Sequence, residues 1–236
     1  MNLNDSPFIR PRAHVQRVEA SAQKLLDRCR SELGLDDLPL PVPVDQWIEH
    51  PLGYDFEITD LSQYGEGVLG AAFIREKRIA VSDRVLANEG RFRFTCAHEL
   101  GHMTLHRRLA TLFRDGPPPD RRVPPRVEWQ ADRFAAAFLM PVDELMRELF
   151  AICATCRLDP RSAIAELMLD TDEAEDHWRR VFLPAVTARF GVSRAAAVYR
   201  FRDVRLTDAR PFIAERVAAS LLGLSRMRRV SPLTFS

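Results

Sequence analysis

Two histidines and a glutamate occur at a spacing that suits metal-dependent hydrolysis. Residues 98 to 102 read His-Glu-Leu-Gly-His, within a largely apolar run from Phe92 to His106. On a helix, His98 and His102 project from one face about 6 Å apart, which suits two imidazoles that bind one tetrahedral zinc ion. Glu99 lies about a third of a turn away, so it can reach a water on the metal without being a ligand. The spacing predicts two metal ligands, His98 and His102, and a general base, Glu99.

A third protein ligand would leave the fourth position of a zinc ion open for water. The candidate lies between Glu128 and Pro141, in a segment whose composition favours a helix that Pro141 ends. Glu128 and Asp132 are four residues apart, at the edge of the apolar face of this helix. We predict that Glu128 is the third ligand and that Asp132 accepts the spare ring N–H of a ligating histidine. The alternative is that both carboxylates only favour the first helical turn through its dipole.

Four stretches of the chain also carry a family resemblance: residues 94–102, Leu105-His106, 128–141 with its Phe-Leu-Met-Pro ending, and 190–201. Together they resemble the ImmA/IrrE family of metallo-endopeptidases, most strongly over residues 66–141. Asp132 stands where Asn is common in that family, and Cys96 where a small or aliphatic residue is frequent, but neither difference removes a ligand. The resemblance implies a protease associated with stress response, mobile-element immunity or toxin–antitoxin pairs. Its substrate would be a separate helix-turn-helix repressor.

Other residues that could do chemistry have simpler interpretations. His106 does not complete the longer metzincin pattern, because Arg107 and Arg108 occupy the region where a Gly and a further His are needed. We interpret His106 as a structural histidine or one that supports a ligand. Cys153-Ala-Thr-Cys156 is a single C-x-x-C without a second pair, so two helical thiols are favoured over a redox couple or half a zinc site. Gly101 indicates close approach of a strand or substrate to the metal helix.

Length and composition are typical of a cytoplasmic enzyme. A chain of 236 residues with 46% apolar content can bury the core of one domain or slightly more. The formal net charge of +1 gives no general reason to expect nucleic-acid or membrane binding. There is no run of 18 apolar residues and no secretion signal at the N-terminus. The four cysteines fit a reducing compartment.

The elements around the motif predict an α+β, zincin-like fold. A small twisted β-sheet would pack on the metal-binding helix, and a helical C-terminal region would follow Pro141. The expected domains are an N-terminal helical segment (1–50), a metalloprotease core (51–150) and the helical C-terminal region (151–236). Before the metal helix the pattern predicts helices over 13–33 and 44–49 and strands over 52–59, 68–74 and 78–82. The last two strands are expected to form a hairpin. After Pro141 it predicts helices over 142–150, 159–169, 171–190 with a break at Pro184, 193–201 and 211–222.

Two segments could influence how a substrate reaches the metal. Val68–Ala72 has small side chains and is the candidate for an edge strand onto which an extended peptide could add, although an ordinary core strand fits equally well. The Pro-rich segment 107–127 joins the two ligand-bearing helices and could act as a lid or be a disordered surface loop. The basic tail Arg226–Arg229 is interpreted as a solvated end.

The predicted function is therefore a zinc-dependent endopeptidase that acts on a cytosolic regulatory protein. Zn2+ would be held by the two histidines and Glu128, with Tyr54 or Tyr64 as candidates for stabilising the oxyanion. The alternative is a metal-binding partner that sequesters a repressor or antitoxin without cutting it, and only the protease needs Glu99. A hydrolase of small molecules would require a closed pocket instead of a groove. The sequence leaves open the scissile bond, the activating signal, the oligomeric state and the choice between zinc and manganese.

Overall fold

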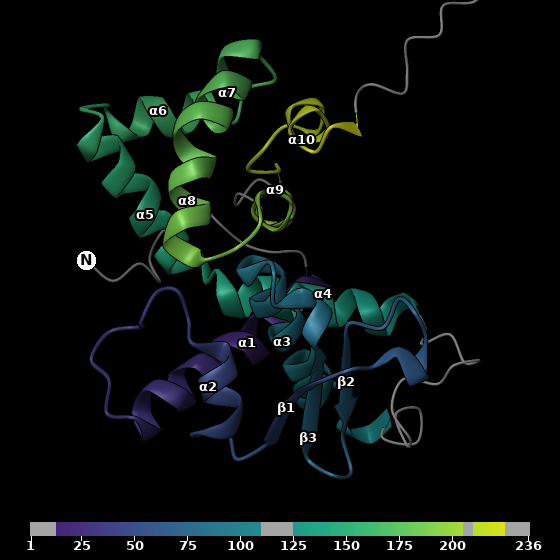
Figure 1. Ribbon diagram of the computed structural model, residues 1–236. Helices are drawn as coiled ribbons and strands as arrows, with labels where there is room; N and C mark the ends of the chain where they lie inside the picture. Colours follow the sequence, from purple (N-terminus) through teal and green to yellow (C-terminus); the bar gives the residue numbers. More distant parts are fainter. Residues whose placement is uncertain (1–12, 110–124, 205–209, 225–236) are drawn as a thin grey trace, which may run out of the picture.

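A small sheet packs against helix α3 (Glu89–Leu105), which carries both histidines of the predicted metal site (Figure 1). The computed structural model describes residues 13–109, 125–204 and 210–224. Helices α1 (Ala13–Glu32) and α2 (Val44–Glu49) precede the sheet and agree with the predicted helices to within one residue. Helix α3 begins after Asn88, whose side chain accepts the backbone N–H of Arg91. The predicted α+β fold is confirmed.

The sheet has the order β1-β3-β2, in which β1 runs parallel and β2 antiparallel to β3. Its strands are short: β1 (Asp55–Thr59), β2 (Gly70–Phe73) and β3 (Arg78–Ser82). The predicted hairpin is therefore present, and β2 lies at an edge of the sheet. Alternate residues point to opposite faces, so Ala72 and Ile79 join the core shared with α3. Ala71 and Phe73 pack on the other face, in a separate small cluster with Leu61.

Helix α4 (Pro125–Leu139) crosses α3 at Gly101 and buries the apolar face that the sequence predicted. A Cβ at Gly101 would lie 3.2 Å from the Cα of Ala131 and 3.3 Å from its carbonyl oxygen. The close approach predicted for Gly101 is present, but the neighbour is a helix and not the strand or substrate that we expected. A side chain at position 101 would also meet the ring of Phe134, at 3.2 Å, so the helices could accept it only by moving apart.

The helical C-terminal region is also confirmed. Its helices are α5 (Val142–Thr155), α6 (Pro160–Leu167), α7 (Asp172–His177), α8 (Leu183–Phe190), α9 (Arg194–Asp203) and α10 (Glu215–Leu221). The helix predicted over 171–190 is not broken at Pro184 itself; its backbone widens just before the proline. A π-helical turn, Trp178–Phe182, precedes the proline, which then occupies the first turn of α8. A wider turn at this place accommodates a residue that lacks an N–H and crowds the preceding turn.

A buried ion pair links the first described helix to α9. The side chain of Arg200 on α9 is 1% exposed and pairs with the carboxylate of Glu19 on α1 through two contacts. In one of them, Nη2 of Arg200 lies 2.9 Å from Oε2 of Glu19. Its Nε also donates to the carbonyl oxygen of Met140, at 2.9 Å, between α4 and α5. A single hydrophobic cluster extends from Val18 to Leu221, so both ends share one core.

Two predictions fall on residues that the structure does not describe. Most of the Pro-rich segment proposed as a lid, residues 110–124, lies outside the described residues, as does the basic tail Arg226–Arg229. Within the described residues, no single helix has the length and apolar character needed to cross a bilayer. The pair Asp172–Phe190 and Arg194–Asp203 passes that test together, by length and composition only, with a bend of 102°.

Replacing Gly101 with leucine tests the contact between α3 and α4. Although leucine favours helices more than glycine, its side chain has no space against the backbone of Ala131. We therefore expect Gly101→Leu to lower the free energy of unfolding by about 2 kcal/mol. Urea denaturation followed by circular dichroism measures the change. The control is Ala154→Leu on the exposed side of α5, for which we expect a change within about 0.5 kcal/mol. Equal stability of the two variants would contradict the role given to Gly101.

Candidate metal centre

Three side chains from two helices converge at one point, and they are the predicted ligands. Nε2 of His98 lies 3.0 Å from Nε2 of His102 and 3.2 Å from Oε2 of Glu128. Nε2 of His102 lies 3.6 Å from Oε1 of Glu128. Bonds of about 2.0–2.1 Å at tetrahedral angles would place such donors about 3.3 Å apart. The donor types and separations therefore fit a group that could hold a metal ion.

The crossing of the two helices accounts for this convergence. His98 and His102 lie one turn apart on α3, and Gly101 lies between them, directly before His102. Glu128 lies one turn before Ala131, the residue that contacts Gly101, so its carboxylate reaches the same point. The side chain of Glu128 remains 41% exposed, whereas that of His102 is almost fully buried. The group is thus open to solvent on the α4 side and closed on the side of the core.

Asp132 orients His98. Its Oδ1 lies 2.9 Å from Nδ1 of His98, and because a carboxylate only accepts, the ring nitrogen donates. This leaves Nε2 of His98 to face the other ligands, in the arrangement predicted for Asp132. Burial lowers the pKa of His98, but hydrogen bonds to Asp132 and Glu128 outweigh burial and raise it to about 10. Without a cation, His98 therefore carries the positive charge of the site.

A second set of hydrogen bonds orients His102. Nε2 of His106 lies 3.1 Å from Oε1 of Gln130, an atom that only accepts, so His106 donates there. Nδ1 of His106 is then free to accept from Nδ1 of His102, at 3.0 Å. The lone pair on Nε2 of His102 consequently points toward Glu128 and His98. Burial and the neighbouring His98 and His106 lower the pKa of His102 to about 2, so it remains a neutral nitrogen donor.

Sequence reasoning assigned His106 only a supporting role and missed Gln130. Gln130 lies two residues from Glu128, and residues two apart on a helix do not share a face. No metal-ligand spacing includes it. The packing of α4 on α3 alone brings its amide to His106.

Glu99 lies beneath the edge strand, beside the three ligands. It is 7% exposed, and a Cβ added at Gly70 of β2 would lie 2.4 Å from its Oε1. Burial raises the pKa of Glu99 to about 7, with a lowering effect from charged His98 and a raising effect from Glu128. A carboxylate with such a pKa can both accept and return a proton at neutral pH. The glycine at position 70 allows the strand to come this close to it.

The two tyrosines considered for oxyanion stabilisation lie elsewhere. The hydroxyl of Tyr54 accepts a hydrogen bond from Arg107, at 2.8 Å. The ring of Tyr64 packs edge-on against Phe73, on the face of the sheet opposite α3. The structure therefore does not bring either tyrosine to the ligand group. Cys153 and Cys156 are both free thiols, the first buried and the second exposed.

Comparison with known proteins assigns the family. Residues 52–202 match the model of the Peptidase_M78 family, described as the IrrE N-terminal-like domain, and the chain belongs to this family of metallopeptidases. No match was found among curated proteins. Among solved structures, the chain is similar to a Mycobacterium tuberculosis transcriptional regulator, with 16% sequence identity and a TM-score of 0.46. That match covers 83% of this chain and 49% of the other, so this chain spans about half the length of that structure.

The ligand group can be tested by metal analysis. We expect the purified protein to carry about one divalent metal ion per chain, and His98→Ala or Glu128→Gln to lose most of it. Inductively coupled plasma mass spectrometry measures the content. The matched control is His177→Ala, which removes an imidazole that is half-exposed and paired with Glu166. Full metal retention in both ligand variants would contradict the assignment.

The raised pKa of His98 predicts how metal binding depends on pH. In the metal-free protein His98 keeps its proton up to about pH 10, and a cation must displace that proton. Metal affinity should therefore increase with pH, roughly tenfold per unit between about pH 7 and 9. Asp132→Asn removes the negative charge that favours the proton, so it should flatten this dependence. Competition with a chromophoric chelator at several pH values measures it, and an affinity independent of pH would exclude displacement of a proton.

Proposed function

We propose that this chain is a zinc-dependent endopeptidase. The observation that carries the proposal is the position of Glu99, a buried carboxylate beside His98, His102 and Glu128 and directly beneath the edge strand β2. A site that only binds a metal has no need for a further carboxylate, outside the ligand group, held in this position. Membership of a metallopeptidase family supports the same conclusion.

In the proposed reaction, the residues of the chain orient the groups and move a proton. A bound zinc ion would supply a Lewis acid that polarises a peptide carbonyl and makes water more acidic. Glu99 accepts the proton of the attacking water and returns it to the nitrogen of the leaving amine. Asp132 and His106 keep the two imidazoles in the orientations that direct Nε2 toward the ion. Burial of Glu99 excludes bulk water from the proton transfer.

The edge strand provides a place for an extended substrate. Among the described strands, β2 pairs only with β3, so the backbone groups on its other side can bind a peptide as an additional strand. Such a peptide would pass beside Gly70 and thus beside Glu99. The absence of a side chain at position 70 keeps this path close to the carboxylate.

We further propose that the substrate is a separate regulatory protein in the cytoplasm, a helix-turn-helix repressor or an antitoxin. This proposal rests on the resemblance to the family. The geometry of the site indicates only that the bound peptide is extended, and it does not identify the substrate. The competing hypothesis is that the chain sequesters such a partner without cutting it. The two hypotheses differ in their need for Glu99.

Glu99→Gln separates cleavage from binding. The change keeps the size of the side chain but removes the base, so metal content should persist while cleavage falls by roughly 100-fold or more. Cleavage is measured by co-expression with candidate helix-turn-helix proteins and mass spectrometry of the products. Glu89→Gln is the matched control, because Glu89 is an exposed glutamate on the same helix. A Glu99→Gln protein with full biological effect would favour sequestration.

A further inference from the structure

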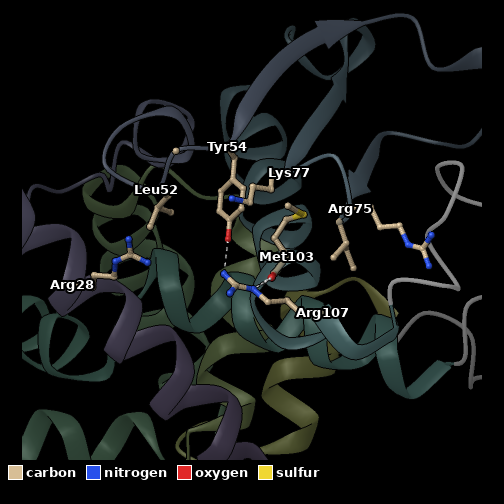
Figure 2. A pocket seen from close by; sticks show the side chains of 9 residues that line it. Arg28, Leu52, Tyr54, Arg75, Lys77, Met103 and Arg107 are labelled. Carbon is tan, nitrogen blue, oxygen red and sulfur yellow. Dashed lines mark hydrogen bonds between the residues drawn. The ribbon is translucent and has the colours of Figure 1, made fainter.

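A cavity lies beside the C-terminal end of α3, and none of the three candidate metal ligands lines it (Figure 2). It has a volume of about 500 Å³, which is within the usual range for sites that bind small molecules. Four segments that are distant in the sequence surround it. They are helix α1, the segment before β1, the turn between β2 and β3, and the end of α3.

The side chains around this cavity are strongly basic. Four cationic residues line it, namely Arg28, Arg75, Lys77 and Arg107, and no carboxylate does. Arg28 is partly neutralised by Glu32, at 2.7 Å. Within the described parts of the chain, no ion pair is found for Arg75 or Lys77. The whole chain has a net charge of only +1, so this concentration of positive charge is local.

Arg107 is held in place although its guanidinium is exposed. Its Nε donates to the carbonyl oxygen of Met103, at 3.0 Å, and its Nη2 donates to the hydroxyl of Tyr54, at 2.8 Å (Figure 2). These contacts use two of the five N–H groups of the guanidinium and leave the others available. A planar cation that is already positioned loses less freedom when it binds an anion than a mobile one does.

The remainder of the cavity is apolar. Leu52, Ile74 and Met103 line it together with the half-buried ring of Tyr54. A simple inorganic anion would use the cations but leave this apolar surface in contact with water. A ligand with a planar, weakly polar body and several negative charges would cover both parts.

We propose that this cavity binds a nucleoside diphosphate or triphosphate. Lys77 and Arg107 would contact the phosphates, because guanidinium and ammonium groups form charge-assisted hydrogen bonds with phosphate oxygens. Figure 2 shows both side chains beside the ring of Tyr54, whereas the guanidinium of Arg75 points away from them. The base would lie against Leu52 and the ring of Tyr54. Arg107 directly follows His106, so a bound nucleotide would contact the end of the helix that carries both histidine ligands. This site is independent of the proposed peptidase activity.

Isothermal titration calorimetry of the metal-loaded protein with magnesium-saturated ADP and ATP tests the proposal. Adenosine and inorganic phosphate serve as probes of the two halves of the ligand. We expect both nucleotides to bind, and both half-ligands to bind at least about tenfold more weakly. The double variant Lys77→Gln/Arg107→Gln should weaken nucleotide binding by at least about tenfold.

A matched control keeps the charge change equal. Arg161→Gln/Arg180→Gln also removes two positive charges, from exposed positions outside the cavity, and should change nucleotide affinity less than twofold. Circular dichroism and metal content verify that each variant is folded and loaded. Equal nucleotide affinity of the two double variants would overturn the proposed location. If phosphate binds as tightly as ADP does, the cavity is a simple anion site. If a glutamate-rich peptide binds and nucleotides do not, the cavity binds a protein partner. Either result overturns the nucleotide proposal.

Discussion

The close packing of α3 on α4 at Gly101 and Ala131 determines where every candidate ligand lies. His98 and His102 are fixed relative to each other by one helical turn, but Glu128 and Asp132 come from another helix. Their positions depend on how near the two helix axes approach, and a single added methyl group at Gly101 would meet a backbone. The same approach brings Gln130 to His106. The metal centre is therefore a property of one helix crossing, and the sheet adds only Gly70 above Glu99.

The hydrogen bonds around the ligands make the site electrostatically consistent. The carboxylate of Asp132 and the Oε1 atom of Gln130 both accept hydrogen bonds. Asp132 thereby fixes the orientation of His98 directly, and Gln130 fixes that of His102 through His106. As a result, the lone pairs of the donors face one another, an arrangement that requires a positive charge between them. In the metal-free protein, the Nε2 proton of His98 supplies that charge. Hydrogen bonds to Asp132 and Glu128 outweigh burial and raise the pKa of His98, whereas burial, together with the neighbouring His98 and His106, lowers that of His102.

The features that could be predicted from the sequence are those set by local geometry. Helical spacing was sufficient to place His98, Glu99 and His102 close together on one helix, and the apolar face of residues 128–141 indicated that Glu128 and Asp132 would lie near them. The contacts of Gly70 and Gln130 depend on packing between elements, and no spacing within the chain encodes such contacts. The same reason explains why Gly101 was matched to the wrong kind of neighbour and why a break was expected at Pro184 instead of a wider turn before it. The basic cavity draws side chains from four separate segments, so it too was absent from the sequence prediction.

The ion pair between Glu19 and Arg200 has a consequence for how this fold can be inherited and rearranged. The pair joins the first described helix to one near the end of the family match, and Met140 ties it to the turn that follows α4. Loss of Glu19 would leave the buried guanidinium of Arg200 without its paired carboxylate, which destabilises the fold. A gene fusion or truncation that separates α1 from α9 would therefore have to replace both residues together. The helices that carry the candidate ligands therefore depend on segments that lie far from the ligand group.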